Sequence, residues 1–401
     1  MKRLYETLLA DHFEHNRQMV FISGPRQVGK TTLAKALLPK ARYFTYDDPE
    51  AARMFAGGPN AVARELGLDS PGSAPKGVVF DELHKFRKWK NLLKGFFDLH
   101  GDGLKIAVTG SARLNVYKRG GDSLVGRYFP YRVHPLSPGE LAGGSAQIDS
   151  PFRAPRKIHA DCIASLLKLG GFPEPFLNGT ERFRNRWRNA RNDQIFREDL
   201  RDLSRVQDIR GIRTLAELLG ARVSSGVNFS GLAQDLQTSP DTVKSWLALL
   251  ESVYVVYCVR PWHRNVANAI RKQPKVYFWD WSAVPAGGAR NENFVASQLL
   301  KNVQWWNDSG LGDFELAYLR DKQQREVDFV VVRDGRPFVL VECKSSANEP
   351  LSPSLEHFRK TLDVPHALQV HLDGPQLGVD PFGHEGRAIK ISAADLFAVL
   401  R

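Results

Sequence analysis

The stretch MVFISGPRQVGKTTLAKALL, residues 19–38, decides the fold of the N-terminal part of this chain. It begins with an apolar run of strand length, continues with the pattern G-x-x-x-x-G-K-[ST] at residues 24–31, and ends in helix-forming residues. A strand, such a loop and a helix in this order are typical of a phosphate-binding site. Backbone N–H groups of the loop and the N-terminus of the following helix then face the phosphates. The stretch therefore predicts a nucleotide site.

The residue types of this loop suit its expected chemistry. Gly24 and Gly29 let the backbone turn toward the phosphates. Lys30 is expected to reach the β- and γ-phosphates, and the hydroxyl of Thr31 to hold Mg²⁺. We expect ATP to be bound by the whole loop and the first helical residues, namely Gly24, Pro25, Arg26, Gln27, Val28, Gly29, Lys30, Thr31 and Thr32.

An apolar strand ending in two acids, VVFDE (78–82), supplies the expected partner of the loop. Asp81 is expected to bind Mg²⁺ through water. Glu82 is the candidate base that orients the attacking water, which a hydrolase needs and a nucleotide switch can do without. The alternative is that Asp81 only caps the next helix.

Two further segments place polar groups near the predicted site. VTGSA (108–112) ends another strand, and strand ends of a parallel sheet converge on the ligand. Thr109 or Ser111 is then positioned to sense the γ-phosphate; we favour Ser111, the alternative being a plain turn residue. SLVGR (123–127) puts Arg127 just before the next strand, either to stabilise the transition state of a neighbouring subunit or as a surface arginine without a role.

Five apolar runs before residue 142 alternate with helical segments, which predicts an α/β fold with a doubly wound parallel sheet. These runs are MVFIS (19–23), RYFTY (42–46), GVVFD (77–81), LKIAVTG (104–110) and RYFPYRV (127–133). A polar stretch at 143–157 suggests a domain boundary.

The middle of the chain is expected to be helical and is interrupted by GGFPEP (170–175), because paired glycines and prolines cannot continue a helix. Between 228 and 260 we expect a helix capped by Ser230, a turn, a second helix capped by Ser239 and begun by Pro240, and a strand. This order is typical of a winged helix. From residue 275 strands and helices alternate again. We therefore expect three domains, at 1–142, 143–265 and 266–401.

The composition limits the classes of protein to consider. The 401 residues include 56 Lys and Arg against 44 Asp and Glu, so the net charge of +12 favours a polyanion such as DNA as partner. A hydrophobic content of 42% excludes general disorder. Three distant cysteines argue against disulfides and a zinc site. Without an apolar run of 18 residues or a signal-like N-terminus, we expect a cytoplasmic protein without membrane contact.

A second group of acids lies in EVDFVVVRDGRPFVLVECK (326–344), which reads as two buried strands. Asp328 and Glu342 are costly there unless they are paired or bind a metal ion. Glu342 and Lys344 are two residues apart and share a strand face.

The turn between these strands decides whether the two acids meet. Asp-Gly at 334–335 indicates a hairpin. A three-residue loop at 334–336 places Asp328 opposite Glu342, whereas a two-residue loop places them on opposite faces.

Together these motifs resemble one family, the bacterial and archaeal AAA-type ATPases that carry a C-terminal domain of unknown function. The resemblance rests on GPRQVGKT, VVFDE, VTGSA, SLVGR, PLSPGE (135–140), GGFPEP, the helix-turn-helix, and KVYFWD with NENFV. It spans nearly the whole chain. It implies a RecA-like AAA core, a helical and winged-helix middle, a C-terminal part similar to restriction endonucleases, and Arg127 as an arginine finger, so we expect a homo-oligomer.

The C-terminal segment also resembles the PD-(D/E)XK nucleases, with Asp328 followed by Glu342-Cys343-Lys344, and with Glu292 as the additional upstream acid. The usual proline before the aspartate is a valine here. The resemblance implies that Asp328, Glu342 and the carbonyl of Cys343, with Glu292 as a further acid, hold a second Mg²⁺ or Mn²⁺ and that Lys344 positions a water. The alternative is a buried ion-pair cluster of these acids and the lysine.

Two basic segments are candidates for contact with nucleic acid. In RFRNRWRNAR (182–191), Arg184, Arg188 and Arg191 share a helix face that either tracks phosphates or is a solvated, ion-paired surface. HKFRKWKNLLK (84–94) follows Glu82 directly and faces either nucleic acid or a neighbouring subunit.

These patterns predict an ATP-hydrolysing protein of AAA type that acts on DNA, with a metal-dependent nuclease site as an additional activity. One alternative is an ATP-driven signalling or regulatory switch whose C-terminal domain only binds DNA or a protein. Another is a nucleotide-gated scaffold or antitoxin-like partner with negligible turnover, against which Glu82 argues.

Overall fold

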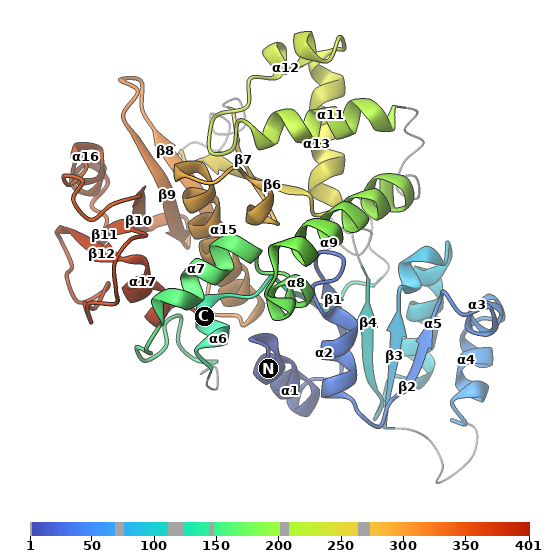
Figure 1. Ribbon diagram of the computed structural model, residues 1–401. Helices are drawn as coiled ribbons and strands as arrows, with labels where there is room; N and C mark the ends of the chain where they lie inside the picture. Colours follow the sequence, from blue (N-terminus) through green and yellow to red (C-terminus); the bar gives the residue numbers. More distant parts are fainter. Residues whose placement is uncertain (1, 69–75, 111–123, 144–147, 201–207, 264–272) are drawn as a thin grey trace. The chain divides into compact units, whose positions relative to one another are not determined.

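The chain divides into two compact units, Lys2–His134 and Pro135–Arg401 (Figure 1). The computed structural model describes residues 2–68, 76–110, 124–143, 148–200, 208–263 and 273–401. The division falls before the PLSPGE motif, whereas the sequence placed its first boundary after residue 142. The reason is that this motif packs within the second unit.

The first unit is built on a sheet of five parallel strands in the order β2-β3-β4-β1-β5. The strands are β1 (Met19–Ser23), β2 (Arg42–Thr45), β3 (Gly77–Asp81), β4 (Lys105–Thr109) and β5 (Tyr128–Arg132). The inner strands β1 and β3 are buried along their whole length, as expected for parallel strands covered on both faces. The predicted parallel α/β core is confirmed.

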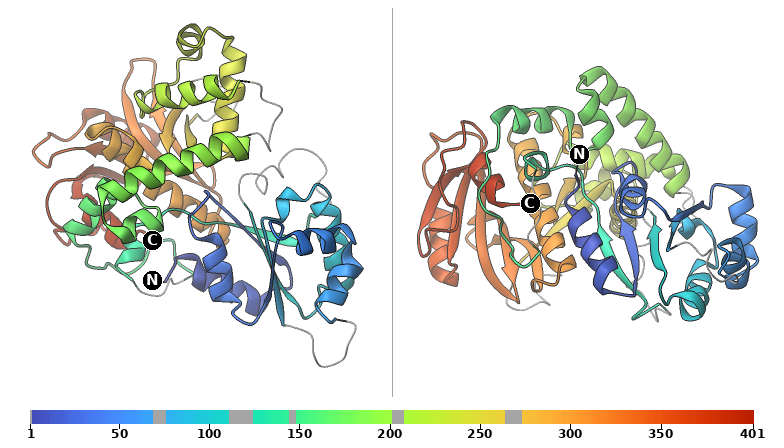
Figure 2. Two further views of the ribbon diagram at one scale, coloured as in Figure 1. Left: turned by 45° about the vertical axis from the view of Figure 1, so that its right-hand side comes forward. Right: turned by 90° about the horizontal axis from the view of Figure 1, so that it is seen from below.

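Helices cover both faces of this sheet, with α1 and α2 on one face and α3, α4 and α5 on the other (Figures 1 and 2). They are α1 (Tyr5–His15), α2 (Lys30–Leu37), α3 (Pro49–Ala56), α4 (Pro59–Glu65) and α5 (Trp89–His100), with a 3₁₀ turn η1 at Leu83–Lys85. Aliphatic and aromatic residues share the core between the sheet and α5, where Phe80 and Phe96 meet edge to face.

The second unit contains a mixed sheet in the order β12-β11-β10-β9-β8-β6-β7. Its strands are β6 (Val256–Pro261), β7 (Lys275–Phe278), β8 (Phe314–Arg320), β9 (Glu326–Arg333), β10 (Arg336–Lys344), β11 (His366–His371) and β12 (Ala388–Ser392). The sequence predicted all but β12. Although the predicted boundary after residue 265 separates β6 from β7, these strands pair with each other, and β6 pairs with β8.

The helices of the second unit fall into an α-rich part before the sheet and a few long helices packed on it. They are α6 (Pro138–Leu141), α7 (Ala160–Leu169), α8 (Pro173–Asn178), α9 (Glu181–Gln194), α11 (Ile209–Gly220), α12 (Phe229–Asp235), α13 (Pro240–Ser252), α15 (Gly288–Asp308), α16 (Pro353–Leu362) and α17 (Ala393–Val399), with a π turn η3 at Ile195–Asp199 and a 3₁₀ turn η4 at Trp281–Ala283. The long helix α15 packs on β7 to β10, and α16 on β9 to β12.

The helix-turn-helix expected between residues 228 and 260 is formed by α12 and α13. The side chain of Ser239 caps α13 and Pro240 is its first residue, as the sequence predicted. The first cap was predicted wrongly: Asn228, not Ser230, accepts the hydrogen bond at the start of α12. A single bridge between Gly226 and Lys275 ties the segment before α12 to β7.

The hairpin between β9 and β10 has a two-residue loop. Asp334 and Gly335 have left-handed φ values of 50° and 78°, and Arg333 pairs with Arg336 across the turn. Positive φ at both loop residues is typical of a type I′ turn, which matches the twist of the strands. A loop of this length alone would separate the two acids predicted to meet.

A β-bulge in β10 changes that outcome. Pro337 pairs with Val332 but Val339 pairs with Val331, so one extra residue is inserted between them. Beyond the bulge Val341 pairs with Phe329, and the next step of this register brings Glu342 across from Asp328. The bulge therefore produces the register that the sequence expected from a longer loop.

A buried ion pair anchors the PLSPGE motif in the second unit. Ser137 and Glu140 form a capping box that begins α6. Nζ of Lys301, on α15, donates to the carbonyl of Pro135 at 2.9 Å and to Ser137 Oγ at 3.0 Å, and forms an ion pair with Glu140. Because the side chains of Lys301 and Glu140 are 2% and 3% exposed, each depends on the other for its charge.

We expect Lys301→Met to lower the free energy of unfolding by about 3–5 kcal/mol, because Glu140 is left buried without its cation. Lys360→Met is the matched control: this lysine is 68% exposed and pairs with Glu356 on the surface of α16, so we expect a change within about 0.5 kcal/mol. Urea unfolding followed by tryptophan fluorescence measures both. Equal effects of the two substitutions would contradict the structural role of Lys301.

Candidate active site

The predicted phosphate-binding loop joins β1 to α2 in the first unit. Gly24 and Gly29 have φ values of 144° and 97°, and Gln27 has a φ of 64°. A side chain at Gly24 would also collide with the carbonyl oxygen of Val133 on the neighbouring segment. Both glycines are therefore required by the backbone itself, as the sequence predicted.

The ammonium of Lys30 lies inside the loop. Nζ donates to the carbonyl oxygens of Gly24 at 3.0 Å and Pro25 at 2.8 Å. From another side the loop is braced by Arg3, which donates to the carbonyl of Val28 at 2.8 Å. Arg3 was not predicted as part of the site, since it lies outside the motif. Of the other predicted contacts, Arg26 is half-buried, and Gln27 and Thr32 are exposed.

Asp81 lies at the end of β3 beside the loop. Its carboxylate accepts hydrogen bonds from hydroxyl groups on three elements. Thr31 on α2 donates to its Oδ1 at 3.0 Å, and Tyr43 on β2 donates to its Oδ2 at 2.5 Å. Thr109, at the end of β4, also donates to Oδ1. The structure thus brings Thr31 and Asp81 together as predicted. Tyr43 was not anticipated, because nothing in RYFTY distinguishes it from an ordinary strand residue.

The Asp81 site fits a hard cation such as Mg²⁺. Its partners are all neutral hydroxyls, and within the described residues Asp81 makes no ion pair, so its negative charge is not compensated. A carboxylate and a threonine hydroxyl are oxygen ligands of the kind that Mg²⁺ prefers.

Glu82 follows Asp81 with a left-handed φ of 52°. Its Oε2 lies 3.7 Å from His84 Nε2 and 3.8 Å from Lys85 Nζ. Burial raises the pKa of Glu82, while the nearby cations Lys30 and Lys85 act in the opposite direction. A non-glycine residue in this backbone region costs about 1–3 kcal/mol and is frequent at functional sites.

The remaining residues predicted for this site are placed differently. Ser111 lies outside the described residues, and the hydroxyl of Thr109 is bound to Asp81. Arg127 precedes β5, and its guanidinium forms two hydrogen bonds with Asp98, at 2.7 and 2.9 Å.

In the second unit, the structure divides the predicted nuclease residues into two ion-paired sets. Lys344 Nζ lies 3.1 Å from Glu342 Oε1. Asp328 and Glu292 instead share the ammonium of Lys275, each at 3.4 Å. Lys275 was missed by the sequence analysis, because it lies far from the motif in the chain.

Protein donors also satisfy several of these carboxylates. The hydroxyl of Tyr277 donates to Glu292 at 2.6 Å, and the amide of Cys343 donates to Asp328 at 2.9 Å. Burial and then repulsion from Asp328 raise the pKa of both Glu292 and Glu342 to about 7. Although burial acts against it, the surrounding carboxylates raise the pKa of Lys275.

As placed, these acids do not fit a divalent ion. Across the part of the chain that the structure describes, no three Asp, Glu, His or Cys side chains are arranged to hold a metal. The arrangement is closer to the alternative, a buried ion-pair cluster, except that Lys275 rather than Lys344 is its central cation.

The arginine-rich helix α9 turns two of its three predicted arginines inward. Nη1 of Arg184 donates to the carbonyl of Lys168. The guanidinium of Arg191 lies 4.3 Å from the centroid of the Phe172 ring. Arg184 and Arg191 are 8% and 3% exposed, so they form neither a phosphate-binding nor a solvated face, although Arg184 lies 3.5 Å from Glu181 as the ion-paired alternative expected.

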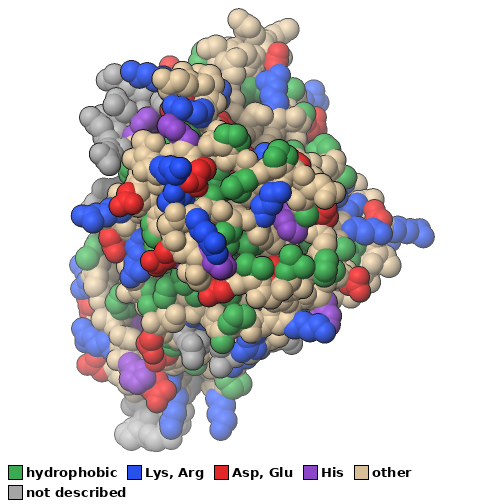
Figure 3. All heavy atoms as spheres, turned by 90° about the vertical axis from the view of Figure 1, so that its left-hand side faces the viewer, with side chains coloured by type: hydrophobic (Ala, Val, Ile, Leu, Met, Phe, Trp, Pro, Cys, Tyr) green, Lys and Arg blue, Asp and Glu red, His purple; other side chains and the backbone are tan. Residues whose placement is uncertain are grey.

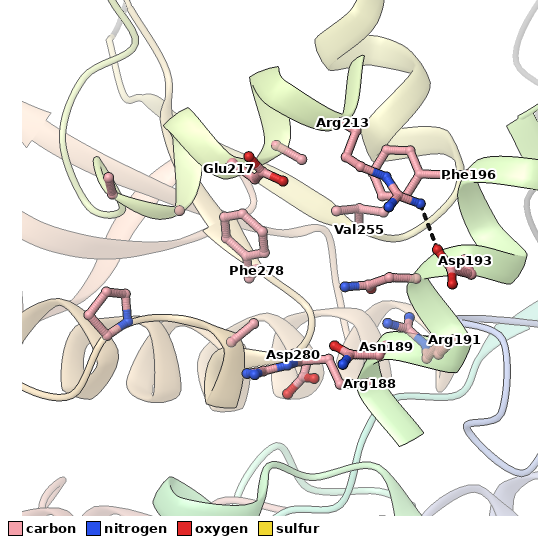
Figure 4. A pocket seen from close by; sticks show the side chains of 16 residues that line it. Arg188, Asn189, Arg191, Asp193, Phe196, Arg213, Glu217, Val255, Phe278 and Asp280 are labelled. Carbon is pink, nitrogen blue, oxygen red and sulfur yellow. Dashed lines mark hydrogen bonds and ion pairs between the residues drawn. The ribbon is translucent and has the colours of Figure 1, made fainter. Parts of the chain in front are cut away.

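A cavity of about 680 Å³ lies beside α9, between this helix, α11 and the end of β7 (Figure 4). Arg188 and Arg191 line it together with the acids Glu217 and Asp280. Arg213 also lines the cavity and donates a hydrogen bond to Asp193 at 2.8 Å. Because both signs of charge line the cavity, it shows no preference for an anion.

The basic segment after Glu82 is partly exposed. Arg87 and Lys88 are on the surface, and within the described residues neither forms an ion pair. Lys94, on α5, is also exposed. Arg87 and Lys88 follow Glu82 by five and six residues, so they are close to the nucleotide site along the chain.

Comparison with protein families divides the chain into three matched segments. Residues 16–142 match an AAA domain, residues 162–287 a domain of unknown function (DUF8612), and residues 287–377 another domain of unknown function (DUF4143). The chain is 25% identical over 360 residues to the "Uncharacterized protein Rv2008c" of Mycobacterium tuberculosis and to the "Uncharacterized protein Mb2031c" of Mycobacterium bovis. Each match covers 85% of this chain and 73% of the relative.

Among solved structures, the chain is similar to the Walker-type ATPase PABY2304 of Pyrococcus abyssi, with a TM-score of 0.40 and 16% identity over 70% of this chain and 94% of that one. It is also similar to the ORC1 protein of Aeropyrum pernix in complex with DNA, with a TM-score of 0.32 and 12% identity over 73% and 91%. At these scores the structures say nothing of what this chain does. None of the described helices has the length and apolar character needed to cross a membrane.

Proposed function

Residues 16–142 form an AAA domain of a P-loop ATPase that is followed by a C-terminal domain of unknown function, and from this premise we propose that the chain hydrolyses ATP with Mg²⁺ and acts on DNA. The observation that carries the proposal is the position of Asp81 beside Thr31, with hydroxyls as the only described hydrogen-bond partners of its carboxylate. A loop that merely turned the chain would not need an uncompensated carboxylate at this point.

Each residue of the site has a proposed part in hydrolysis. Backbone N–H groups of the loop and Lys30 bind the phosphates, which replace the loop carbonyls now bound to Lys30. Thr31 and Asp81 hold Mg²⁺, which when bound neutralises charge on the phosphate oxygens. Glu82 orients the attacking water and accepts its proton.

Arg127 is proposed to act on the nucleotide of a neighbouring subunit in a homo-oligomer. It precedes β5, which runs parallel to β1 from Met19 to Ser23, while the phosphate-binding loop follows the far end of β1. The five residues of β1 span roughly 16 Å, more than an arginine side chain reaches. Val125 and Leu99, beside the pair of Arg127 with Asp98, are 72% and 64% exposed, as at a protein interface.

Action on DNA is supported by the net charge of +12 and by the exposed cations Arg87 and Lys88 near the site. The helix-turn-helix contributes little charge, since Lys244 on α13 is paired with Asp241 at 2.9 Å. On the face in Figure 3, Lys and Arg are interspersed with Asp and Glu. In the alternative function, a regulatory switch, the helix-turn-helix and this face of mixed charge would contact a protein partner. Cleavage of DNA is not part of the proposal, because the acidic cluster already contains a cation.

The proposed function is tested by ATP turnover with and without single-stranded, duplex and branched DNA. We expect turnover that requires Mg²⁺ and rises with at least one DNA form. Lys30→Ala is expected to abolish nucleotide binding, because its ammonium contacts the phosphates in the ground state. Glu82→Gln is expected to keep nucleotide binding and lower kcat by about 10²–10⁴-fold, because it acts only on the water.

Nucleotide binding measured by calorimetry separates the two variants. Wild-type turnover in Glu82→Gln would show that another group is the base. If none of the DNA forms changed the rate of ATP turnover, the regulatory switch would be favoured and the ATPase assignment would stay intact.

The raised pKa of Glu82 predicts a pH dependence. The base must be deprotonated, so kcat should fall as the pH falls through a pKa above that of an ordinary glutamate. Lys85→Met removes a cation that lowers this pKa and should move the acid limb to higher pH. The exposed neighbour Lys88 supplies the control Lys88→Met, which should leave the limb in place. If the acid limb lay at the same pH in the wild type, Lys85→Met and Lys88→Met, Glu82 would not be the titrating group.

For Arg127→Ala we expect nucleotide affinity near that of the wild type and turnover reduced by about 10³-fold or more, as for other arginine fingers. Mixing this variant with Lys30→Ala should restore part of the activity, because some interfaces then combine an intact loop with an intact arginine. Arg17→Ala, which removes another arginine of this unit that is paired on the surface, is the control. Absence of rescue in confirmed mixed oligomers would exclude action across an interface.

A further inference from the structure

A lysine ammonium lies at the centre of the acidic cluster of the second unit. Nζ of Lys275, at the start of β7, is 2.7 Å from Glu326 Oε1 and 3.4 Å from both Glu292 Oε1 and Asp328 Oδ1. The three carboxylates come from α15 and β9, and the side chain of Lys275 is 3% exposed. A magnesium ion bound by the same carboxylates needs their oxygens at about 2.1 Å from one point, which is the space that this ammonium fills.

We propose that the ammonium of Lys275 is the permanent counter-ion of this cluster and takes the place that a divalent cation would need, so the second unit binds no catalytic metal and does not cut DNA. The proposal goes beyond the ATPase function and does not depend on it. It assigns the acids that resemble a nuclease motif to the stability of the sheet.

The first support is that moving the ammonium away would leave three carboxylates, whose side chains are only 15–29% exposed, without this cation. Burying a carboxylate without a cation is costly, and three of them face Lys275. The ammonium also lies over the ring of Tyr318, with Nζ 5.4 Å from the ring centroid. Displacing this lysine by a metal would require burying or extruding the ammonium elsewhere.

The second support is that protein donors bind two of these carboxylates in addition to Lys275, Glu292 at the same oxygen, Oε1, and Asp328 at its other oxygen, Oδ2. Glu292 accepts from Tyr277, and Asp328 accepts from the amide of Cys343. A metal ion would have to break these bonds or share their oxygens.

Glu342 does not reverse this conclusion. One of its oxygens pairs with Lys344, and the other, Oε2, is buried without a hydrogen-bond partner in the described residues. A single carboxylate oxygen supplies one ligand, whereas Mg²⁺ and Mn²⁺ take about six oxygen ligands. The other acids that would complete the shell are those bound to Lys275.

The experiment measures Mn²⁺ binding to the nucleotide-free full-length protein by electron paramagnetic resonance. We expect Asp328→Asn to bind as much Mn²⁺ as the wild type, because neither holds the ion in the second unit. A wild-type Mn²⁺ site that is lost in Asp328→Asn would overturn the proposal. This comparison does not depend on any substitution of Lys275.

Removing the ammonium should open the cluster. We expect Lys275→Met to gain an Mn²⁺ site at least tenfold tighter than any in the wild type, and to lose it again in the double variant Lys275→Met with Asp328→Asn. Lys390→Met, at an exposed lysine on β12 of the same sheet, is the matched control and should gain nothing. A folded Lys275→Met protein without added Mn²⁺ binding would contradict the assignment. If that variant does not fold, the comparison of the wild type with Asp328→Asn decides.

Discussion

The candidate active site of the first unit is arranged around one carboxylate, that of Asp81, which needs hydrogen-bond donors. Parallel strands bring their carboxyl ends to one edge of the sheet, and Asp81 stands at that edge between neighbouring strand ends. Its donors, Thr31, Tyr43 and Thr109, come from the helix after the loop and from the strands on either side. The arrangement fixes the carboxylate without neutralising it, which keeps it available to a metal ion bound with a nucleotide.

The carboxylates of the second unit also need donors, but their donors include a cation. Asp328 and Glu292 are also partly buried at strand and helix positions of an α/β fold, but they share a lysine ammonium that compensates part of their charge. Hydroxyl donors satisfy the geometry of a carboxylate and leave its charge, whereas an ammonium removes the charge as well. The identity of the donor, rather than the presence of acids, therefore separates a site suited to a cation from an ion-paired cluster.

This difference also explains how far the sequence could be interpreted. The phosphate-binding loop, its strand and its helix are contiguous, so local pattern and spacing were sufficient to predict β1, the two glycines and Lys30. Asp81 could be predicted as the partner of Thr31, because an apolar strand ending in an acid is the expected companion of such a loop. Tyr43 remained hidden, because a tyrosine in a short strand is ordinary unless the neighbouring strand is known.

The C-terminal cluster depends on contacts that no local pattern contains. Its register results from a two-residue turn combined with a bulge at residues 337–339, and either feature alone would change which residues meet. Lys275 precedes Asp328 by more than 50 residues and reaches it only through the pairing of β6 with β7 and β8. A motif of two acids and a lysine could therefore be recognised in the sequence, while the lysine that neutralises it could not.

The arginines of α9 show a related limit for charge patterns. Their spacing correctly placed Arg184, Arg188 and Arg191 on one face of a helix, but spacing does not say whether that face meets solvent or protein. Arginine is suited to both, because its guanidinium can stack on aromatic rings while it donates to backbone carbonyls. Arg191 lies over Phe172, and Arg184 donates to a carbonyl, so this positive charge contributes to packing. The cations that remain exposed near Glu82 are consequently the stronger argument for contact with a polyanion than the longest arginine-rich run in the chain.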